Sequence, residues 1–210
     1  SDRIQIEEML KNKQAYIATG SDNSARYFNY YFGKYPHLIR SNRTSVAILQ
    51  GDESPADLQA LGADIFDYFG LGCRNVSKVF VKNQGQLTDL LDALEPFSWV
   101  ANHHKYFNNY EYNKSIYLVN RTPHLDNGFL LLKESTDLVS PIGVLFYEIY
   151  SEEHELKTKL KDLDAKIQCV VGNQTMDLPG IIPFGQTQCP QPWDYADGVD
   201  TLQFLSSLGD

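Results

Sequence analysis

The sequence predicts an α/β protein in which a mainly parallel sheet is flanked by helices. Segments with strand character alternate with segments of helical periodicity along most of the 210 residues, the pattern of strand–helix–strand crossovers. With 42% hydrophobic and 21% charged residues, the chain can bury a substantial core. It contains no internal repeat, no glycine fingerprint of a dinucleotide-binding unit and no phosphate-binding loop.

Capping and turn residues mark the element boundaries in the first half of the chain. Gly20-Ser21-Asp22 forms a turn before an aromatic-rich segment, and Ser54-Pro55 supplies an N-cap and a first-turn proline. The elements expected here are a strand at Gln14–Thr19, a helix from about Ser24 to Gly33, a strand at Val46–Leu49, a helix at Ser54–Phe69, a strand at Val76–Val81 and a helix through Leu87–Leu94.

The second half continues the alternation. Pro96 closes the preceding helix, and Ser151 is the expected N-cap of a helix with an acidic start and a lysine-rich later part, which complements the helix dipole. The elements expected here are strands at Ser115–Val119, Gly128–Leu132, Ile142–Ile149 and Lys166–Val171, and helices after Ser151 and from about Asp197 to Leu208.

Cys73 is the residue that points most directly to chemistry. It lies between the helix that ends near Gly70 and the strand that begins at Val76, on a turn where glycines let the backbone approach a ligand closely. Because it follows a helix C-terminus, the macrodipole disfavours its thiolate, so activation must come from backbone N–H groups, Arg74, a base or a cofactor. The alternative is a buried, inert thiol, since unpaired cysteines are often core residues.

Composition excludes several classes of function. The net charge is −9 and no basic block compensates it, which argues against binding to nucleic acid or to a membrane surface. No apolar run is long enough to cross a bilayer, and the start has no signal-peptide pattern. The three cysteines, Cys73, Cys169 and Cys189, are odd in number and far apart, which indicates free thiols in a reducing compartment, the cytoplasm.

The pair His103-His104 is the one candidate for a metal site. Adjacent residues on a helix or strand diverge, and no cysteine or carboxylate follows at ligand spacing. We therefore expect no metal, and we interpret residues 102–110 as a polar, aromatic surface or cleft wall.

Four short segments, read in order, carry a family resemblance: Ala18-Thr19-Gly20-Ser21, Gly70-Leu-Gly-Cys73-Arg-Asn-Val-Ser77-Lys-Val-Phe80-Val81, Asp137-Leu-Val-Ser-Pro141-Ile-Gly-Val and Pro183-Phe184-Gly185. Together they resemble the C-terminal half of the aldehyde dehydrogenase superfamily, specifically its LuxC-type acyl-CoA reductases. The resemblance implies that Cys73 is the nucleophile and that substrate and cofactor meet in a cleft between two domains.

The resemblance also implies roles for the other residues. Gly20 and Ser21 would lie beside the nicotinamide, Asp137 would contact the cofactor ribose in place of the usual glutamate, and Phe184 would line the nicotinamide or acyl pocket. Each has an ordinary structural alternative: a solvated turn for Asp137 and core packing for Phe184. Asn75 and Ser77 are candidates for substrate binding, although strand packing explains them equally well.

The resemblance divides the chain into three parts. Residues 1–44 would be the C-terminal remnant of the cofactor-binding domain, residues 45–190 the catalytic domain and residues 191–210 a C-terminal tail helix. Most of the cofactor-binding domain would be absent, including the asparagine that the family adds to its oxyanion hole. The oligomeric state stays open, a homo-oligomer included.

The expected function is the reduction of an acyl-CoA or other acyl thioester to an aldehyde. Hydrolytic members of the superfamily carry a glutamate base upstream of the cysteine, whereas the comparable stretch Leu38–Thr44 has no carboxylate. Without a base to activate water, an acyl-enzyme on Cys73 would persist until hydride arrives from NADPH, which the resemblance favours, or from NADH. The alternatives are a hydrolytic or phosphorylating aldehyde dehydrogenase and a non-catalytic or oligomerisation fragment of such an enzyme.

Overall fold

The structure, a computed structural model, describes residues 4–208, and these divide into two compact units. The larger unit is Arg43–Trp193, and the smaller unit combines the described parts of Ser1–Asn42 and Asp194–Asp210. None of the helices between residues 4 and 208 combines the length and the apolar character that a membrane span requires.

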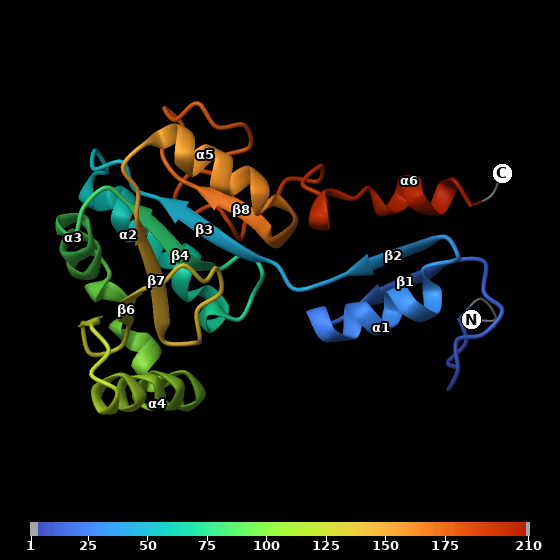
Figure 1. Cartoon of the computed structure of the whole chain (residues 1–210), viewed down its shortest axis with the longest axis horizontal. Coiled ribbons are helices and arrows are strands. Elements are labelled where there is room, and N and C mark those ends of the chain that lie inside the picture. Colours follow the sequence, from blue (N-terminus) through green and yellow to red (C-terminus); the bar gives the residue numbers. More distant parts are fainter. Residues whose placement is uncertain (1–3, 209–210) are drawn as a thin grey trace. The chain divides into compact units, whose positions relative to one another are not determined.

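The larger unit is built on a six-stranded sheet in the order β5-β6-β7-β4-β3-β8 (Figure 1). Its four central pairings are parallel, and only β5 pairs antiparallel with β6. The strands are β3 (Thr44–Ile48), β4 (Val76–Val81), β5 (Leu125–Asp126), β6 (Leu131–Glu134), β7 (Val144–Ile149) and β8 (Ile167–Val171). All five residues of β3 are buried, as expected for a central parallel strand that is covered on both faces.

Helices cover both faces of this sheet. The helices are α2 (Pro55–Phe66), α3 (Gly85–Ala93), α4 (His104–Val119) and α5 (Glu153–Asp162), and short 3₁₀ helices lie at Asp67–Gly70, Glu95–Asn102 and Asp164–Lys166. On one face Ala47 and Val79 pack in a core with residues of α2 and α3, while Val46 and Phe80 point to the other face and pack with α5. Alternate residues of each strand therefore serve different cores.

The smaller unit contains a β–α–β arrangement. The parallel strands β1 (Tyr16–Thr19) and β2 (His37–Arg40) are joined through α1 (Asp22–Phe32), and Tyr16 stacks on Phe32 with ring centroids 4.2 Å apart. The tail adds a 3₁₀ turn at Ala196–Gly198 and the short helix α6 (Thr201–Ser206). Arg40 ties β2 to this tail, because its guanidinium bonds the Thr201 hydroxyl at 2.9 Å and the Asp197 carboxylate at 3.5 Å.

The predicted strand at Ser115–Val119 is wrong. These residues form the last part of α4, a helix of 16 residues that also contains most of the segment interpreted as a polar surface or cleft wall. Tyr106, Tyr110, Asn113 and Tyr117 are buried at helical spacing, so packing against β6 and β7 overrides the local strand propensity of the sequence.

Other predicted boundaries shift by a few residues. The helix expected to reach Phe69 ends at Phe66, where a 3₁₀ turn takes over, and β6 runs from Leu131 to Glu134 rather than over Gly128–Leu132. Ser151 is not the cap of α5, because the N-cap position is Glu152 and it makes no side-chain capping bond. The tail helix is shorter than expected and is capped by the Asp200 side chain, which accepts from the Gln203 N–H.

Candidate functional site

Cys73 lies on an exposed turn that enters β4. The turn starts with an unusual backbone: Tyr68 (φ 53°) and Phe69 (φ 58°) both adopt the left-handed conformation before Gly70 (φ 73°). Bulky residues rarely do so, because their Cβ crowds the backbone. The chain thus makes a sharp reversal between α2 and the cysteine, and Cys73 does not pack in the core.

Asn75 holds this turn in place. Its side chain is 2% exposed, and its amide donates to the carbonyls of Asp64 (3.1 Å) and Asp67 (2.8 Å) while its Oδ1 accepts from the Gly72 N–H (2.8 Å). Both amide hydrogens are therefore used within the chain. This geometry makes Asn75 a residue that fixes the backbone on either side of Cys73.

The backbone around Cys73 leaves one donor open. The Cys73 carbonyl accepts from the Ser45 hydroxyl at 3.0 Å, and the Gly72 N–H is taken by Asn75. Among the hydrogen bonds of residues 4–208, none has the Cys73 N–H as donor. An exposed thiol and an unengaged N–H on the same residue form the minimal pair for attack on a carbonyl and stabilisation of the resulting oxyanion.

Arg74 connects the turn to the end of the larger unit. Its Nη1 donates to the Thr187 carbonyl at 3.0 Å and to the Cys169 Sγ at 3.4 Å. Cys169 is buried in β8, and burial raises the pKa of its thiol, which keeps it protonated and unreactive. Arg74 is thus engaged in holding segments together beside Cys73.

The turn at Pro183-Phe184-Gly185 is anchored by a buried carboxylate that the sequence interpretation missed. Asp64 in α2 accepts from the Gly185 N–H (2.6 Å), the Thr187 N–H (3.0 Å) and the Thr187 hydroxyl (2.8 Å). Burial raises the pKa of Asp64, and these three hydrogen bonds only partly oppose the rise. Phe184 itself is half-buried against the core that includes α2. The signal in the sequence was an aspartate among the apolar positions of an amphipathic helix.

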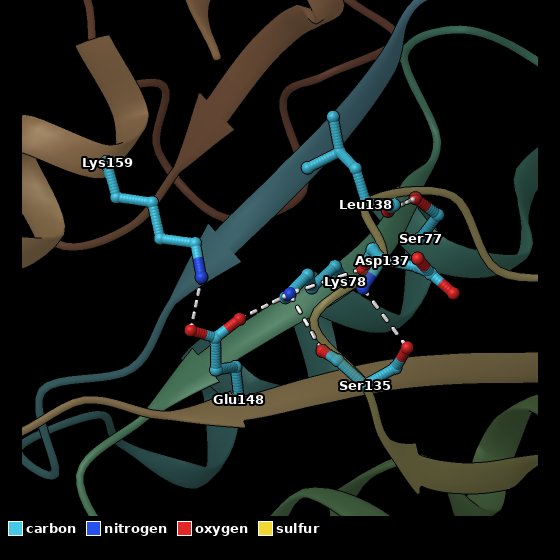
Figure 2. A network of polar contacts seen from close by, with 7 residues as sticks. All are labelled: Ser77, Lys78, Ser135, Asp137, Leu138, Glu148 and Lys159. Atoms are coloured by element: carbon cyan, nitrogen blue, oxygen red, sulfur yellow. Dashed lines mark hydrogen bonds and ion pairs between the residues drawn. The ribbon is translucent and has the colours of Figure 1, made fainter. Parts of the chain in front are cut away.

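Ser77 and Asp137 are brought together by the loop after β6. The Ser77 hydroxyl donates to the Leu138 carbonyl at 2.9 Å and shares a second hydrogen bond with Thr44, while the Asp137 carboxylate is exposed (Figure 2). Asp137 makes no ion pair within the described chain, and its backbone N–H bonds the Ser135 hydroxyl at 3.1 Å. Ser77 therefore fixes the loop, and Asp137 stands on it with its carboxylate turned outward.

Lys78, which the sequence interpretation did not single out, holds the same loop by hydrogen bonds from within the sheet. Its side chain is 1% exposed, and Nζ donates to the Ser135 carbonyl (2.9 Å), the Asp137 carbonyl (3.2 Å) and Glu148 Oε2 (2.6 Å), so that all three hydrogens are used (Figure 2). Burial lowers the pKa of Lys78, and the Glu148 carboxylate offsets part of this. Burial also opposes ionisation of Glu148, but hydrogen bonds from Lys159 and Lys78 outweigh it and lower the pKa of Glu148.

Gly20 and Ser21 belong to the smaller unit, where they join β1 to α1. The Gly20 N–H donates to the Arg40 carbonyl at 3.1 Å, and a Cβ at Gly20 would meet the Ser24 Cβ at 2.7 Å, so the close approach of turn and helix requires glycine. The Ser21 hydroxyl caps α1 by accepting from the Ser24 N–H at 3.2 Å. The predicted strand, turn and helix are thus present around both residues.

His103 and His104 are not a pair of metal ligands in this geometry. His103 is the N-cap of α4, where Nδ1 accepts from the Tyr106 N–H at 3.3 Å, and its ring stacks on Phe69, whereas His104 is exposed. Across the described part of the chain, His, Cys, Asp and Glu side chains form no group of three that could hold a metal ion.

A small cavity lies next to the start of the turn. Its volume is about 30 Å³, enough for one water-sized molecule. Most of its lining residues are apolar, Ser77, Tyr106 and Ser140 also line it, and Cys73 does not. This cavity is too small to be an acyl pocket.

Comparison with known proteins was made by sequence and by structure. No protein-family model and no curated protein matches the chain. Among solved structures, the fold is similar to that of Δ-pyrroline-5-carboxylate dehydrogenase from Mycobacterium tuberculosis bound with NAD, at 15% identity and a TM-score of 0.53, over 92% of this chain and 47% of that one.

Two further structures agree with this match. A substrate-bound Staphylococcus aureus AldH shares 12% identity (TM-score 0.54; 78% of this chain, 42% of that one). An indole-3-acetaldehyde dehydrogenase complexed with NAD⁺ shares 10% identity (TM-score 0.52; 77% and 41%). The chain spans less than half of the length of these proteins. The likeness confirms the predicted fold class, a mainly parallel α/β sheet flanked by helices as in the catalytic domain of an aldehyde dehydrogenase.

Proposed function

We propose that this chain is the catalytic portion of an acyl thioester reductase of the acyl-CoA type and that Cys73 is its nucleophile. One observation carries the proposal: in a chain with an aldehyde dehydrogenase fold, the cysteine expected to react is exposed on a fixed turn with its own N–H unengaged. An inert packing role for Cys73 does not fit this exposure.

The acyl transfer needs few groups. The Cys73 sulfur attacks the carbonyl carbon of the thioester, a new carbon–sulfur bond forms, and the bond to CoA or another carrier thiol breaks. The proton that Cys73 gives up ends on the released thiol. The Cys73 N–H donates to the oxygen as it becomes negative, and Asn75 and Ser45 keep that N–H aimed by holding Gly72 and the Cys73 carbonyl.

The proposal of reduction rather than hydrolysis rests on a missing base. The stretch Leu38–Thr44 contains no carboxylate. Asp64, whose carbonyl accepts from the Asn75 amide next to the Cys73 turn, is buried and its carboxylate already accepts three hydrogen bonds. With neither of these positions able to deprotonate water, we expect an acyl group on Cys73 to be long-lived.

We propose NADPH or NADH as the reductant, and each unit, taken by itself, has a feature that suits a nicotinamide cofactor. In the smaller unit, Gly20 and Ser21 stand between a strand and the N-terminus of an 11-residue helix. In the larger unit, Asp137 is exposed and its carboxylate can accept from ribose hydroxyls. When bound, the reduced nicotinamide supplies the hydride that converts the acyl group on Cys73 to an aldehyde. Phe184 contributes by packing its turn against the core, and Ser77 by fixing the loop that carries Asp137.

The test is mass spectrometry of the chain after incubation with acyl-CoAs of graded length. We expect one acyl mass on the peptide that contains Cys73 and none in Cys73→Ala. The exposed Cys189 is an internal control for nonspecific thiol acylation, and the buried Cys169 should stay unmodified. Equal acylation of Cys189 and Cys73, or an adduct that survives Cys73→Ala, contradicts the assignment.

A second candidate is oxidation of an aldehyde to an acid. It is favoured by the similar structures, which are named as dehydrogenases and are solved with NAD⁺. The two activities share the nucleophile and differ in what resolves the acyl-enzyme. Following the isolated acyl-enzyme in water distinguishes them: a half-life of hours at neutral pH supports the reductase, and rapid release of the free acid supports the dehydrogenase.

A further inference from the structure

The left-handed backbone before Cys73 needs something to hold it. Tyr68 and Phe69 are consecutive bulky residues with positive φ, and such conformations persist only where the surroundings over-determine them. Tyr68 is 70% exposed and offers little packing. Of these two side chains, Phe69 is therefore the one that can restrain the turn by packing, in addition to the hydrogen bonds that Asn75 makes to its backbone.

Phe69 is held by aromatic contacts from outside the turn. Its ring stacks on the His103 ring, with centroids 3.9 Å apart and planes at 17°, and meets Trp99 edge-on with centroids 6.0 Å apart. Both partners belong to the segment formed by the 3₁₀ helix Glu95–Asn102 and the start of α4. Aromatic contacts have preferred geometries, so the stack and the edge-on contact together favour one orientation of the Phe69 ring.

His103 is itself fixed by hydrogen bonds that leave its ring little freedom. As N-cap of α4, its ring accepts from the Tyr106 N–H through Nδ1. Its backbone N–H donates to the Val100 carbonyl at 3.0 Å, and its backbone carbonyl accepts from the Phe107 N–H at 3.0 Å. The ring that holds Phe69 is thus mounted on a helix terminus.

We infer that His103 is a positioning residue for Cys73: by stacking on Phe69 it holds the strained turn in the conformation that presents the thiol and its N–H. The inference rests on the proposed function. Asn75 binds the backbone before the reversal at Asp67 and after it at Gly72, and the Phe69–His103 stack holds a side chain within the reversal itself. Without the stack, Phe69 can relax to a negative φ, and the backbone that leads to Cys73 rotates with it.

Two substitutions at His103 separate stacking from capping. His103→Asn keeps a side-chain acceptor for the Tyr106 N–H and removes the ring, whereas His103→Phe keeps a ring and removes the acceptor. In the full chain, His103→Asn should slow acylation of Cys73 by acetyl-CoA at least about tenfold with little change in the thermal midpoint, since small misplacements of reacting groups are costly. His103→Phe should lower the thermal midpoint yet acylate at close to the wild-type rate.

The outcomes separate this inference from the proposed function. If the wild-type chain acylates and His103→Asn matches its rate, or if His103→Phe slows acylation as much as His103→Asn, the positioning role is wrong. If the wild-type chain does not acylate, the proposed function fails, and iodoacetamide then tests the positioning role alone. In that case the ratio of the alkylation rate of Cys73 to that of Cys189 should fall in His103→Asn and stay at the wild-type value in His103→Phe. An unchanged ratio in His103→Asn overturns the positioning role. Should the His103 variants not fold, Phe69→Leu against Phe69→Tyr gives the same comparison.

Discussion

Replacing Asn75 by alanine tests the device that fixes the Cys73 turn. The substitution removes three hydrogen bonds of 2.8, 2.8 and 3.1 Å from a side chain that is 2% exposed. An intramolecular hydrogen bond contributes about 1 kcal/mol net, so the sum is about 3 kcal/mol. The exposed Gly72 N–H can return to water, whereas the carbonyl of the buried Asp64 cannot, which gives an expected range of about 2–4 kcal/mol.

Urea unfolding followed by tryptophan fluorescence measures this loss. Trp99 and Trp193 both belong to the larger unit, so the signal reports the unit that contains the turn. Asn108→Ala is the matched control, because Asn108 is exposed on α4 and should change stability by less than about 0.5 kcal/mol. An Asn75→Ala loss no larger than that of the control would refute the view that this amide holds the turn.

Asn75→Asp sharpens the same test. The new carboxylate keeps an acceptor for the Gly72 N–H but turns acceptors toward two carbonyls, which disfavours its charged form and raises its folded pKa. Such a group stabilises the fold fully below its unfolded pKa of about 3.9, and the contribution is lost as pH rises through the folded pKa. Relative to wild type, Asn75→Asp should therefore lose stability as pH rises, and a constant difference across the range contradicts the geometry.

Three further predictions concern the supports of the site. Lys78→Met should lower the unfolding free energy by about 2–4 kcal/mol in urea, because Glu148 keeps Lys159 but two loop carbonyls lose their donor; a loss under about 1 kcal/mol contradicts this. The lowered pKa of Glu148 means that its stabilising contribution is present above the unfolded value of 4.5 and is lost as pH falls through the folded value, so Glu148→Gln should flatten the stability curve below about pH 4.5. Gly143→Ala should destabilise by at least about 2 kcal/mol more than Gly128→Ala in thermal unfolding: both have positive φ, but only at Gly143 would the Cβ meet Tyr110 Cα, at 2.8 Å.

Local sequence signals located the sheet and the cysteine turn well. The apolar runs of β3, β4 and β8 have the composition of buried parallel strands, and Ser54-Pro55 marks the start of α2 with a capping box that the structure contains. Their positions follow from local composition and capping residues, although the strands pair with distant segments of the chain.

The elements that were missed depend on distant contacts. α4 carries aromatic and apolar residues on both its buried and its exposed sides: Tyr110 and Tyr117 are buried, and Tyr112 and Leu118 are exposed. Its sequence therefore lacks the amphipathic period that predicts a helix. β2 is only four residues long and is a strand through its pairing with β1. Tertiary contacts therefore determine the secondary structure of both α4 and β2.

The same division applies to the site. Cys73 could be selected as a candidate from its turn. The contacts of Asn75 and Ser77 could not be predicted, because their partners, backbone groups and the Thr44 hydroxyl, lie 3 to 61 residues away. Lys78 offered a signal that was available: a lysine inside Val76–Val81 must be paired if that strand is buried. Only the folded sheet shows that its partners are Glu148 and the loop after β6.

The polar network beside Cys73 explains why α2 carries a buried aspartate at some cost in stability. The Asp64 carboxylate binds the segment from Gly185 to Thr187, its carbonyl accepts from Asn75, and the Thr187 carbonyl accepts from Arg74, the neighbour of Cys73. Burial raises the pKa of Asp64, which shows that the buried position disfavours the charged form of this carboxylate. An apolar residue would serve the core of α2 better and would keep the backbone carbonyl for Asn75, but it could not bind the segment from Gly185 to Thr187, to which Arg74 is also attached. A polar network of this kind adds geometric definition, which the proposed role of Cys73 as a nucleophile on an exposed turn would require.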